Sequence, residues 1–195
     1  MRSRTHIASA NALCLLCLNP TTPKELIITM SAATVGGIIC DLDVRTSEVH
    51  KLVDTVTSII FLLLFGLYVY DYKYNAGIYT TLKHGVFYKP ILGFILFLIL
   101  ILYGSHKPHR SFMHSIFGCI LFTGISYLFF GKVWLPFLIG FISHIVLDFL
   151  NKKGVRIFYP VKQGYCLSLC DSDGLTDKIL FVLSILIVVV KLFLM

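Results

Sequence analysis

The chain has 195 residues, of which 57% are hydrophobic and only 14% charged, and its mean hydropathy is +0.85. This composition excludes an ordinary soluble domain and is typical of an integral membrane protein. The formal net charge is +7, but the basic residues are scattered over short breaks between apolar segments. That scatter excludes a nucleic-acid-binding patch and favours contact with anionic lipid headgroups.

Apolar segments follow one another along the chain, and each is a candidate helix. The seven segments cover residues 6–18, 25–40, 52–70, 88–104, 112–130, 132–150 and 178–195. A spanning helix needs roughly 17 to 25 residues, so the last five segments qualify and the first two are short. The sequence therefore predicts an all-α protein, an integral membrane helical bundle of about five to seven hydrophobic segments that forms a single domain over residues 1–195.

The connections between these segments carry local signals. Thr22 is a suitable N-cap for the second segment, with Pro23 at the first helical position and Glu25 placed to close a capping box. The connection at 71–90 is rich in tyrosine and is predicted to lie at the membrane interface.

Alternate connections lie on opposite sides of the membrane if all segments cross it. The side of the N-terminus then receives eleven of the 17 Lys and Arg residues, and the other side receives six. Because cytoplasmic loops are enriched in Lys and Arg, the N-terminal side is predicted to be cytoplasmic. Four histidines and three aspartates also fall on this side: His6, Asp41, Asp43, His109, His114, His144 and Asp148.

The stretch HIVLD places His144 and Asp148 one helical turn apart on one helix face. Two side chains at this spacing can hold one ion. A carboxylate within an apolar segment is unfavourable unless it has a partner. The alternative is a helix-end aspartate paired with Lys152 or Lys153, beside a neutral histidine bonded to the backbone.

The stretch HRSFMHS, at 109–115, concentrates polar residues between two apolar segments. Ser111 is predicted to cap the following helix, so that the chain bends between His109 and His114 and both can face one site. Arg110, beside a helix N-terminus, is suited to hold a phosphate or carboxylate. The alternative is a capped helix with interfacial Arg and His.

Asp41 and Asp43 add two carboxylates from one turn, for which the alternative is a solvated loop. Carboxylates combined with imidazoles suit Zn²⁺, Mn²⁺ or Fe²⁺. We expect a site for one or two divalent metal ions, Zn²⁺ or Mn²⁺, held by His6, Asp41, Asp43, His109, His114, His144 and Asp148.

Four stretches carry a further signal: RTHIA, GGIICDLD, HRSFMHS and GFISHIVLDFLNKKGVRIFYP. Together they resemble the YdjM-like family of bacterial inner-membrane proteins, which are described as metal-dependent hydrolases, and the resemblance runs from about residue 4 to residue 160. It implies a multi-pass protein of the cytoplasmic membrane whose motif positions are the seven residues above together with Arg110 and Ser115. The sequence departs from the family pattern at Cys40, where the family usually has Pro, and at Ser111 and Met113, where it has Gly and Thr.

Two functions are compatible with these residues. A membrane-bound hydrolase acting on a phosphoester or lipid-linked ester would use the metal to activate water, with Asp41 or Asp43 as general base if it is not a ligand. Arg110 would hold the anionic group, and Ser115 is a further catalytic candidate.

The alternative is a transporter or ion-binding membrane protein, whose sites tend to lie near the midplane between repeated helices. The polar set at one face favours the hydrolase. The expected partners are membrane lipids and an unidentified small-molecule or lipid substrate, with no nucleic acid.

Overall fold

The computed structural model describes residues 1–44, 48–78, 80, 81 and 88–194. Its α-helices are α1 (Ser3–Cys17), α2 (Pro23–Ile39), α3 (Glu48–Tyr74), α5 (Tyr88–Ser105), α6 (Ile116–Phe130), α7 (Trp134–Phe149) and α8 (Leu175–Phe193). Short 3-10 helices lie between them: η1 (Cys40–Asp43), η2 (Phe112–His114) and η3 (Gly131–Val133). Every predicted apolar segment coincides with one α-helix, so the prediction of an all-α fold is confirmed.

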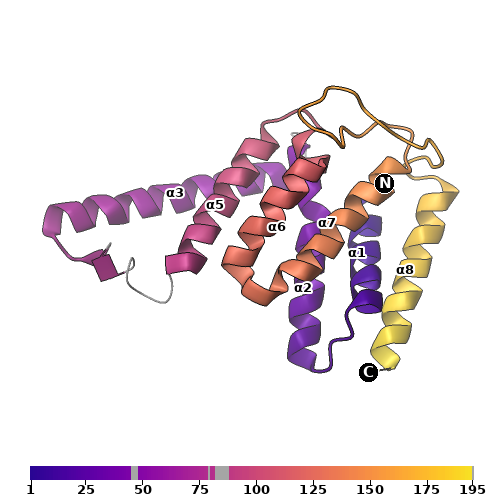
Figure 1. The fold of residues 1–195 in the computed structure, drawn as a ribbon, viewed down its shortest axis with the longest axis horizontal. Coiled ribbons are helices and arrows are strands. Elements are labelled where there is room, and N and C mark those ends of the chain that lie inside the picture. Colours follow the sequence, from indigo (N-terminus) through magenta and orange to yellow (C-terminus); the bar gives the residue numbers. More distant parts are fainter. Residues whose placement is uncertain (45–47, 79, 82–87, 195) are drawn as a thin grey trace.

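The helices α1, α2, α5, α6, α7 and α8 pack into a bundle, whereas α3 extends sideways from it (Figure 1). Within the bundle, α1 contacts α2, α7 and α8, and α7 contacts α2 and α6. The N-terminus, η1, the turn before α6 and the loop 150–174 gather at one end, and the C-terminus lies at the other (Figure 1). We call the end that holds the N-terminus the polar end.

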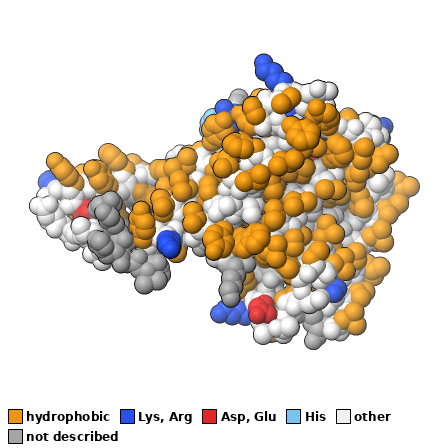
Figure 2. Space-filling model, in the orientation of Figure 1, with side chains coloured by type: hydrophobic (Ala, Val, Ile, Leu, Met, Phe, Trp, Pro, Cys, Tyr) orange, Lys and Arg blue, Asp and Glu red, His pale blue; other side chains and the backbone are white. Residues whose placement is uncertain are grey.

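Within the residues that the structure describes, three helical stretches are long and apolar enough to cross a membrane: Pro23–Asp43, Thr55–Tyr74 and Tyr88–Ser105. The expectation that the second segment is too short was wrong, because η1 continues the helical path of α2 to Asp43, giving 21 residues. The expectation that the last five segments all qualify was wrong for three of them. Helices α6 and α7 have only 15 and 16 residues, and α8 carries three charged residues, Asp177, Lys178 and Lys191. The visible face of the bundle and of α3 is covered mainly by hydrophobic side chains, as expected for a surface in contact with lipid (Figure 2).

The centre of the bundle is built from aromatic side chains. Phe97 packs edge-on against Phe122 and Phe137, with ring centroids 5.5 and 6.0 Å apart. Phe122, Phe137 and Phe141 are fully buried. These rings come from α5, α6 and α7, so they fix the distances between three helices at the centre of the bundle.

Two glycines bring α2 and α7 into close backbone contact. A Cβ added at Gly36 would lie 2.1 Å from the Phe137 carbonyl oxygen, and one added at Gly140 would lie 2.2 Å from the Ala33 carbonyl oxygen. Real Cβ atoms do not approach other atoms so closely. Small residues at helix interfaces allow this approach in membrane proteins. The contact places the last turns of α2 beside α7, where His144 lies.

Local signals for the helix starts were partly right. Thr22 caps α2 as predicted, because its hydroxyl accepts a hydrogen bond from the Glu25 N–H at 3.2 Å. Ser111 does not cap α6, and that prediction was wrong. The helix begins at Ile116 and Ser115 caps it, accepting from the Gly118 N–H at 2.9 Å. The connection at 71–90 starts inside α3, and part of it lies outside the described residues.

The position of the polar end makes the topology testable. In a cysteine-free background, Arg2→Cys and His106→Cys should react with a membrane-impermeant thiol reagent from the same side, and Thr21→Cys from the opposite side. The reason is that the chain crosses the length of the bundle between residues 2 and 21 (Figure 1). From the bias in Lys and Arg, we expect the first side to be the cytoplasmic one. Labelling of positions 2 and 106 from opposite sides would contradict this arrangement.

Candidate metal centre

The polar residues selected from the sequence come from separate parts of the chain and meet at the polar end. His6 lies near the start of α1, the two aspartates of η1 follow α2, and His144 and Asp148 lie in the last turns of α7. His109 lies before η2 and His114 lies in it. All seven belong to three overlapping groups whose ligand atoms lie within 4.8 Å of one another: His6, His144 and Asp148; Asp41, His114 and His144; Asp43, His109 and His114.

The separations between donor atoms match those of a coordination shell. Donors bound to one tetrahedral Zn²⁺ at roughly 2.0–2.2 Å lie about 3.3–3.6 Å from each other. The Nε2 atoms of His114 and His144 are 3.2 Å apart. Asp148 Oδ2 lies 3.4 Å from His114 Nε2, and Asp148 Oδ1 lies 3.5 Å from His6 Nε2. Asp41 Oδ1 lies 3.6 Å from His144 Nε2. The donor set therefore fits a divalent cation.

The orientation of His144 is fixed from outside the cluster. Its Nδ1 donates a hydrogen bond to the Gly37 carbonyl oxygen at 2.7 Å. The lone pair of Nε2 is therefore directed at the other donors, as is usual for metal-binding histidines with a backbone partner. His109 differs, because its Nδ1 lies 2.6 Å from Oδ1 of Asp43, which itself belongs to the cluster.

Several imidazole nitrogens of the cluster have no hydrogen-bond partner among the described residues. They are both ring nitrogens of His6 and Nδ1 of His114, and both side chains are buried. The His6 ring also stacks on His144, with centroids 3.8 Å apart. Buried polar atoms are nearly always satisfied. His6 Nε2 and His114 Nδ1 lie 3.5 and 3.4 Å from carboxylate oxygens of Asp148 and Asp43, so a cation between these atoms would satisfy both partners.

Asp148 is the carboxylate with the most positive neighbours. Its Oδ2 lies 3.1 Å from an Arg110 guanidinium nitrogen, and its Oδ1 lies 3.2 Å from the Met1 amino group. The sequence analysis gave an ion pair between Asp148 and Lys152 or Lys153 as the alternative. This was wrong for Lys152, because its ammonium pairs with Asp171 at 2.7 Å.

The charge of the cluster also acts on His114, in the turn before α6. Burial lowers the pKa of its imidazole, but the nearby carboxylates of Asp148 and Asp43 raise it more, to about 9. Without a metal ion, His114 therefore keeps its proton at neutral pH and offsets one carboxylate charge. A metal ion bound there would replace that proton.

Arg110 connects the cluster to the loop 150–174. Its backbone takes a positive φ of 61°, its N–H donates to Asp43 Oδ2 at 3.1 Å, and its guanidinium donates to the Lys153 carbonyl as well as contacting Asp148. The two terminal guanidinium nitrogens are thus engaged within the protein, whereas the buried Nε has no hydrogen-bond partner among the described residues. Its predicted role in holding an anionic group stays a prediction.

A cavity of about 290 Å³ opens beside the cluster. Asp41, His109, Arg110 and Asp148 line it, together with residues that the sequence did not single out: Met1, Ser3, Val44, Lys153 and Ser172. Ser3 donates to Asp41 Oδ2 at 3.0 Å. No spacing in the sequence connects residues 3, 153 and 172 with the motifs, so only the fold reveals them.

The comparison with known families agrees with the motifs. The profile of the YdjM inner membrane protein family matches residues 1–194. The chain belongs to this family. It is also similar to two proteins of Methanothermobacter thermautotrophicus, the uncharacterized proteins ORF4, 31% identical over 61 residues, and ORF4', 36% identical over 62 residues. Each match covers 31% of this chain and 26% of the relative, so the chain spans about a quarter of the length of these proteins. No solved structure matches the chain.

One catalytic candidate of the YdjM motif set lies at the margin of the cluster. The Ser115 hydroxyl donates to the Phe112 carbonyl at 2.8 Å while it caps α6. The serine is buried and belongs to none of the three groups. Its catalytic role stays a prediction, and the contacts that the structure gives it are those of a helix cap.

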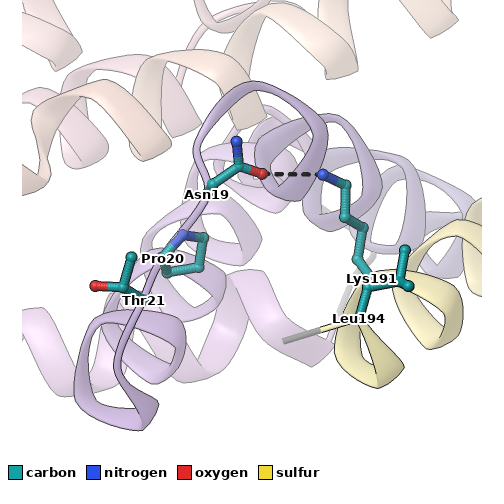
Figure 3. Close-up of a pocket in the computed structure, with 5 residues that line it drawn as sticks. All are labelled: Asn19, Pro20, Thr21, Lys191 and Leu194. Atoms are coloured by element: carbon teal, nitrogen blue, oxygen red, sulfur yellow. Dashed lines mark hydrogen bonds between the residues drawn. The ribbon is translucent and has the colours of Figure 1, made fainter.

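The opposite end of the bundle offers a useful contrast. A cavity of about 370 Å³ lies between the loop that connects α1 with α2 and the C-terminal end of α8. Its lining residues are Asn19, Pro20, Thr21, Lys191 and Leu194 (Figure 3). The Lys191 ammonium donates to Asn19 Oδ1 at 2.9 Å. These lining residues include no histidine or carboxylate, so this larger cavity lacks the donors that a metal ion needs.

Proposed function

We propose that this protein is a membrane-bound metal-dependent hydrolase that acts on a phosphoester or lipid-linked ester at the cytoplasmic face. The proposal rests chiefly on the largely buried cluster of His and Asp donors, whose separations fit a coordination shell. Within the described residues, both ring nitrogens of His6 and Nδ1 of His114 make no hydrogen bond. A bound Zn²⁺ or Mn²⁺ would lower the pKa of a water molecule and polarise the substrate oxygen.

The residues of the cluster have separable roles in this proposal. Asp43 is buried and is engaged by His109 and by the Arg110 N–H, so it suits a ligand. Asp41 has a side chain that is 26% exposed and lines the cavity. Its carboxylate is therefore the better candidate for a general base that takes a proton from water.

The position of the cluster supports an enzyme more than a transporter. The donors lie where α1 begins and where α2 and α7 end, at the polar end of the bundle. Transport sites tend to lie near the membrane midplane, between broken helices. A centre at the membrane surface is accessible to lipid headgroups and to soluble esters.

Metal analysis of the full chain, purified in detergent without chelators and in metal-replete conditions, tests the first step of the proposal. We expect one or two divalent transition-metal ions per chain, and hydrolysis of at least one compound in a screen of phosphoesters and lipids. A metal-free protein that binds none of the supplied ions would refute the proposal.

Arg110→Lys separates charge from geometry. A lysine keeps the positive charge but cannot contact Asp148 and the Lys153 carbonyl at the same time with one planar group. Once an activity is found, we expect a folded, metal-containing variant whose turnover is lower by roughly tenfold or more. Arg4→Lys is the matched control, because Arg4 is exposed and lies over the Phe181 ring. Unchanged turnover in Arg110→Lys would exclude a role in the reaction.

A further inference from the structure

The cavity at the polar end has the size of an anionic headgroup. Its volume of about 290 Å³ lies just below the range of roughly 300–1,000 Å³ that is typical of sites for drug-sized ligands. It therefore has room for a phosphate and the atoms next to it, and little room for an acyl chain. Three donors of the metal cluster line it: Asp41, His109 and Asp148.

Among the cations at this end, Lys153 differs from its neighbours. Arg110 is engaged with Asp148 and with a backbone carbonyl, and the Lys152 ammonium is paired with Asp171. Lys153 lines the cavity and is exposed, and its ammonium makes no hydrogen bond or ion pair with the part of the chain that the structure describes. Its backbone is held in place, because its carbonyl accepts from Arg110. The Lys153 backbone is thus fixed beside the cavity, while its ammonium has no acidic partner among the described residues.

Charge counting shows when this ammonium can attract an anion. The three aspartates of the cluster carry three negative charges, and Arg110, Lys153 and the Met1 amino group, which all line the cavity, carry three positive ones. With the imidazoles neutral, as metal binding requires, one divalent ion gives the site a net charge of +2 and two ions give it +4. The metal-loaded site therefore attracts anions, and the flexible lysine is the cation that is free to contact them.

We propose that Lys153 binds the phosphate group of the substrate beside the metal centre, an inference that rests on the proposed metal-dependent function. The phosphate belongs to a lipid headgroup or to a soluble phosphoester, and the cavity would accept the same group from either source. Lys153 is then a substrate-binding residue that the sequence motifs do not include.

Phosphate binding to the full chain, loaded with Mn²⁺ in detergent, tests this inference without any known activity. Bound Mn²⁺ broadens the ³¹P resonance of a phosphate held close to it, which yields a dissociation constant. We expect saturable binding of inorganic phosphate to the wild type and binding about tenfold weaker in Lys153→Ala, the loss of one charge-assisted contact. Lys152→Ala should bind phosphate like the wild type, and Lys153→Arg should retain most of the affinity.

The outcomes distinguish this inference from the proposed function. If the wild type binds Mn²⁺ but Lys153→Ala binds phosphate equally well, or if Lys152→Ala is equally impaired, the role of Lys153 is refuted while the metal centre stands. If the wild type binds no Mn²⁺, both proposals fall. Parallel titrations with glycerol 3-phosphate and with short-chain phosphatidic acid identify the source: tighter binding of the lipid, with the same dependence on Lys153, indicates a headgroup.

Discussion

Replacing Asp148 with asparagine is expected to remove most of the bound metal from the protein. The substitution keeps the size of the side chain and removes its charge. Asp148 belongs to the group with His6 and His144, and its Oδ2 lies 3.4 Å from His114 Nε2. Loss of a side chain that only supports a metal ligand lowers metal affinity about 10- to 100-fold. Asp148 is itself a candidate ligand, so its loss should weaken metal affinity by roughly 100-fold or more.

Elemental analysis of purified wild type and variant, supported by a competition titration with a chromophoric chelator, measures this effect. Asp171→Asn is the matched control, because Asp171 is exposed and pairs only with Lys152 among the contacts described. His106→Ala controls for the loss of a histidine at the same end of the bundle, since His106 is exposed and belongs to none of the three groups. If Asp148→Asn and His114→Ala both keep the full metal content, the cluster is a set of ordinary salt bridges and not a metal site.

Replacing Gly140 with alanine is expected to disrupt the packing of α2 against α7. The new Cβ would lie 2.2 Å from the Ala33 carbonyl oxygen and 3.0 Å from the Gly37 nitrogen, which are backbone atoms that cannot rotate away. The two helices must separate, and the bond from His144 to the Gly37 carbonyl is then strained. Overpacking typically costs 1–3 kcal/mol, and a backbone clash should reach about 3 kcal/mol, which lowers Tm by roughly 10 °C.

Thermal unfolding in detergent measures the change, and Gly124→Ala is its matched control. Gly124 also lies within a helix, but a Cβ added there has nothing within 4 Å. Alanine favours a helix more than glycine does, so the control should be as stable as the wild type or slightly more stable. A wild-type Tm in Gly140→Ala would show that α2 and α7 are not in close contact.

Segment lengths and polarity were enough to predict which parts of this chain are helical and which residues meet. An apolar run of the right length has few alternatives to a helix in a membrane, since its backbone must satisfy its own hydrogen bonds. Once the segments alternate in direction, the ends that carry polar residues follow by counting. This is why His6 and Asp148 could be assigned to one site although they lie 142 positions apart.

Other features depend on atomic contacts that the sequence does not encode locally. Ser111 and Ser115 are equally good caps by residue type, and the 3-10 turn η2 between them decides in favour of Ser115. The same turn moves His114 out of α6. The sideways direction of α3 was also unpredicted, because an apolar helix of this length has the same composition whether it packs in the bundle or leaves it.

The partner of Arg110 was unpredictable for a different reason. Its guanidinium reaches Asp148, which lies 38 positions away, and a carbonyl of the loop 150–174. Sequence spacing indicates side chains that share one helix face, but it gives no distance between a turn and a loop that meet only after the bundle has formed. The glycines of α2 and α7 were missed similarly, because a glycine in an apolar segment is compatible with many kinds of packing.

Backbone hydrogen bonds hold the loop 150–174 against the bundle. Leu167 and Leu169 donate to the carbonyls of Phe149 and Leu150 at the end of α7, Arg156 donates to Arg110, and Val155 and Tyr165 exchange two hydrogen bonds. Long irregular connections are usually the first parts of a protein to open, and their amides then exchange with solvent faster than those of the helices. In this loop the bonded amides should exchange slowly, at rates close to those of the helix ends. A ligand entering the cavity would meet a wall that is already ordered, so its binding would carry little entropy penalty for arranging the chain.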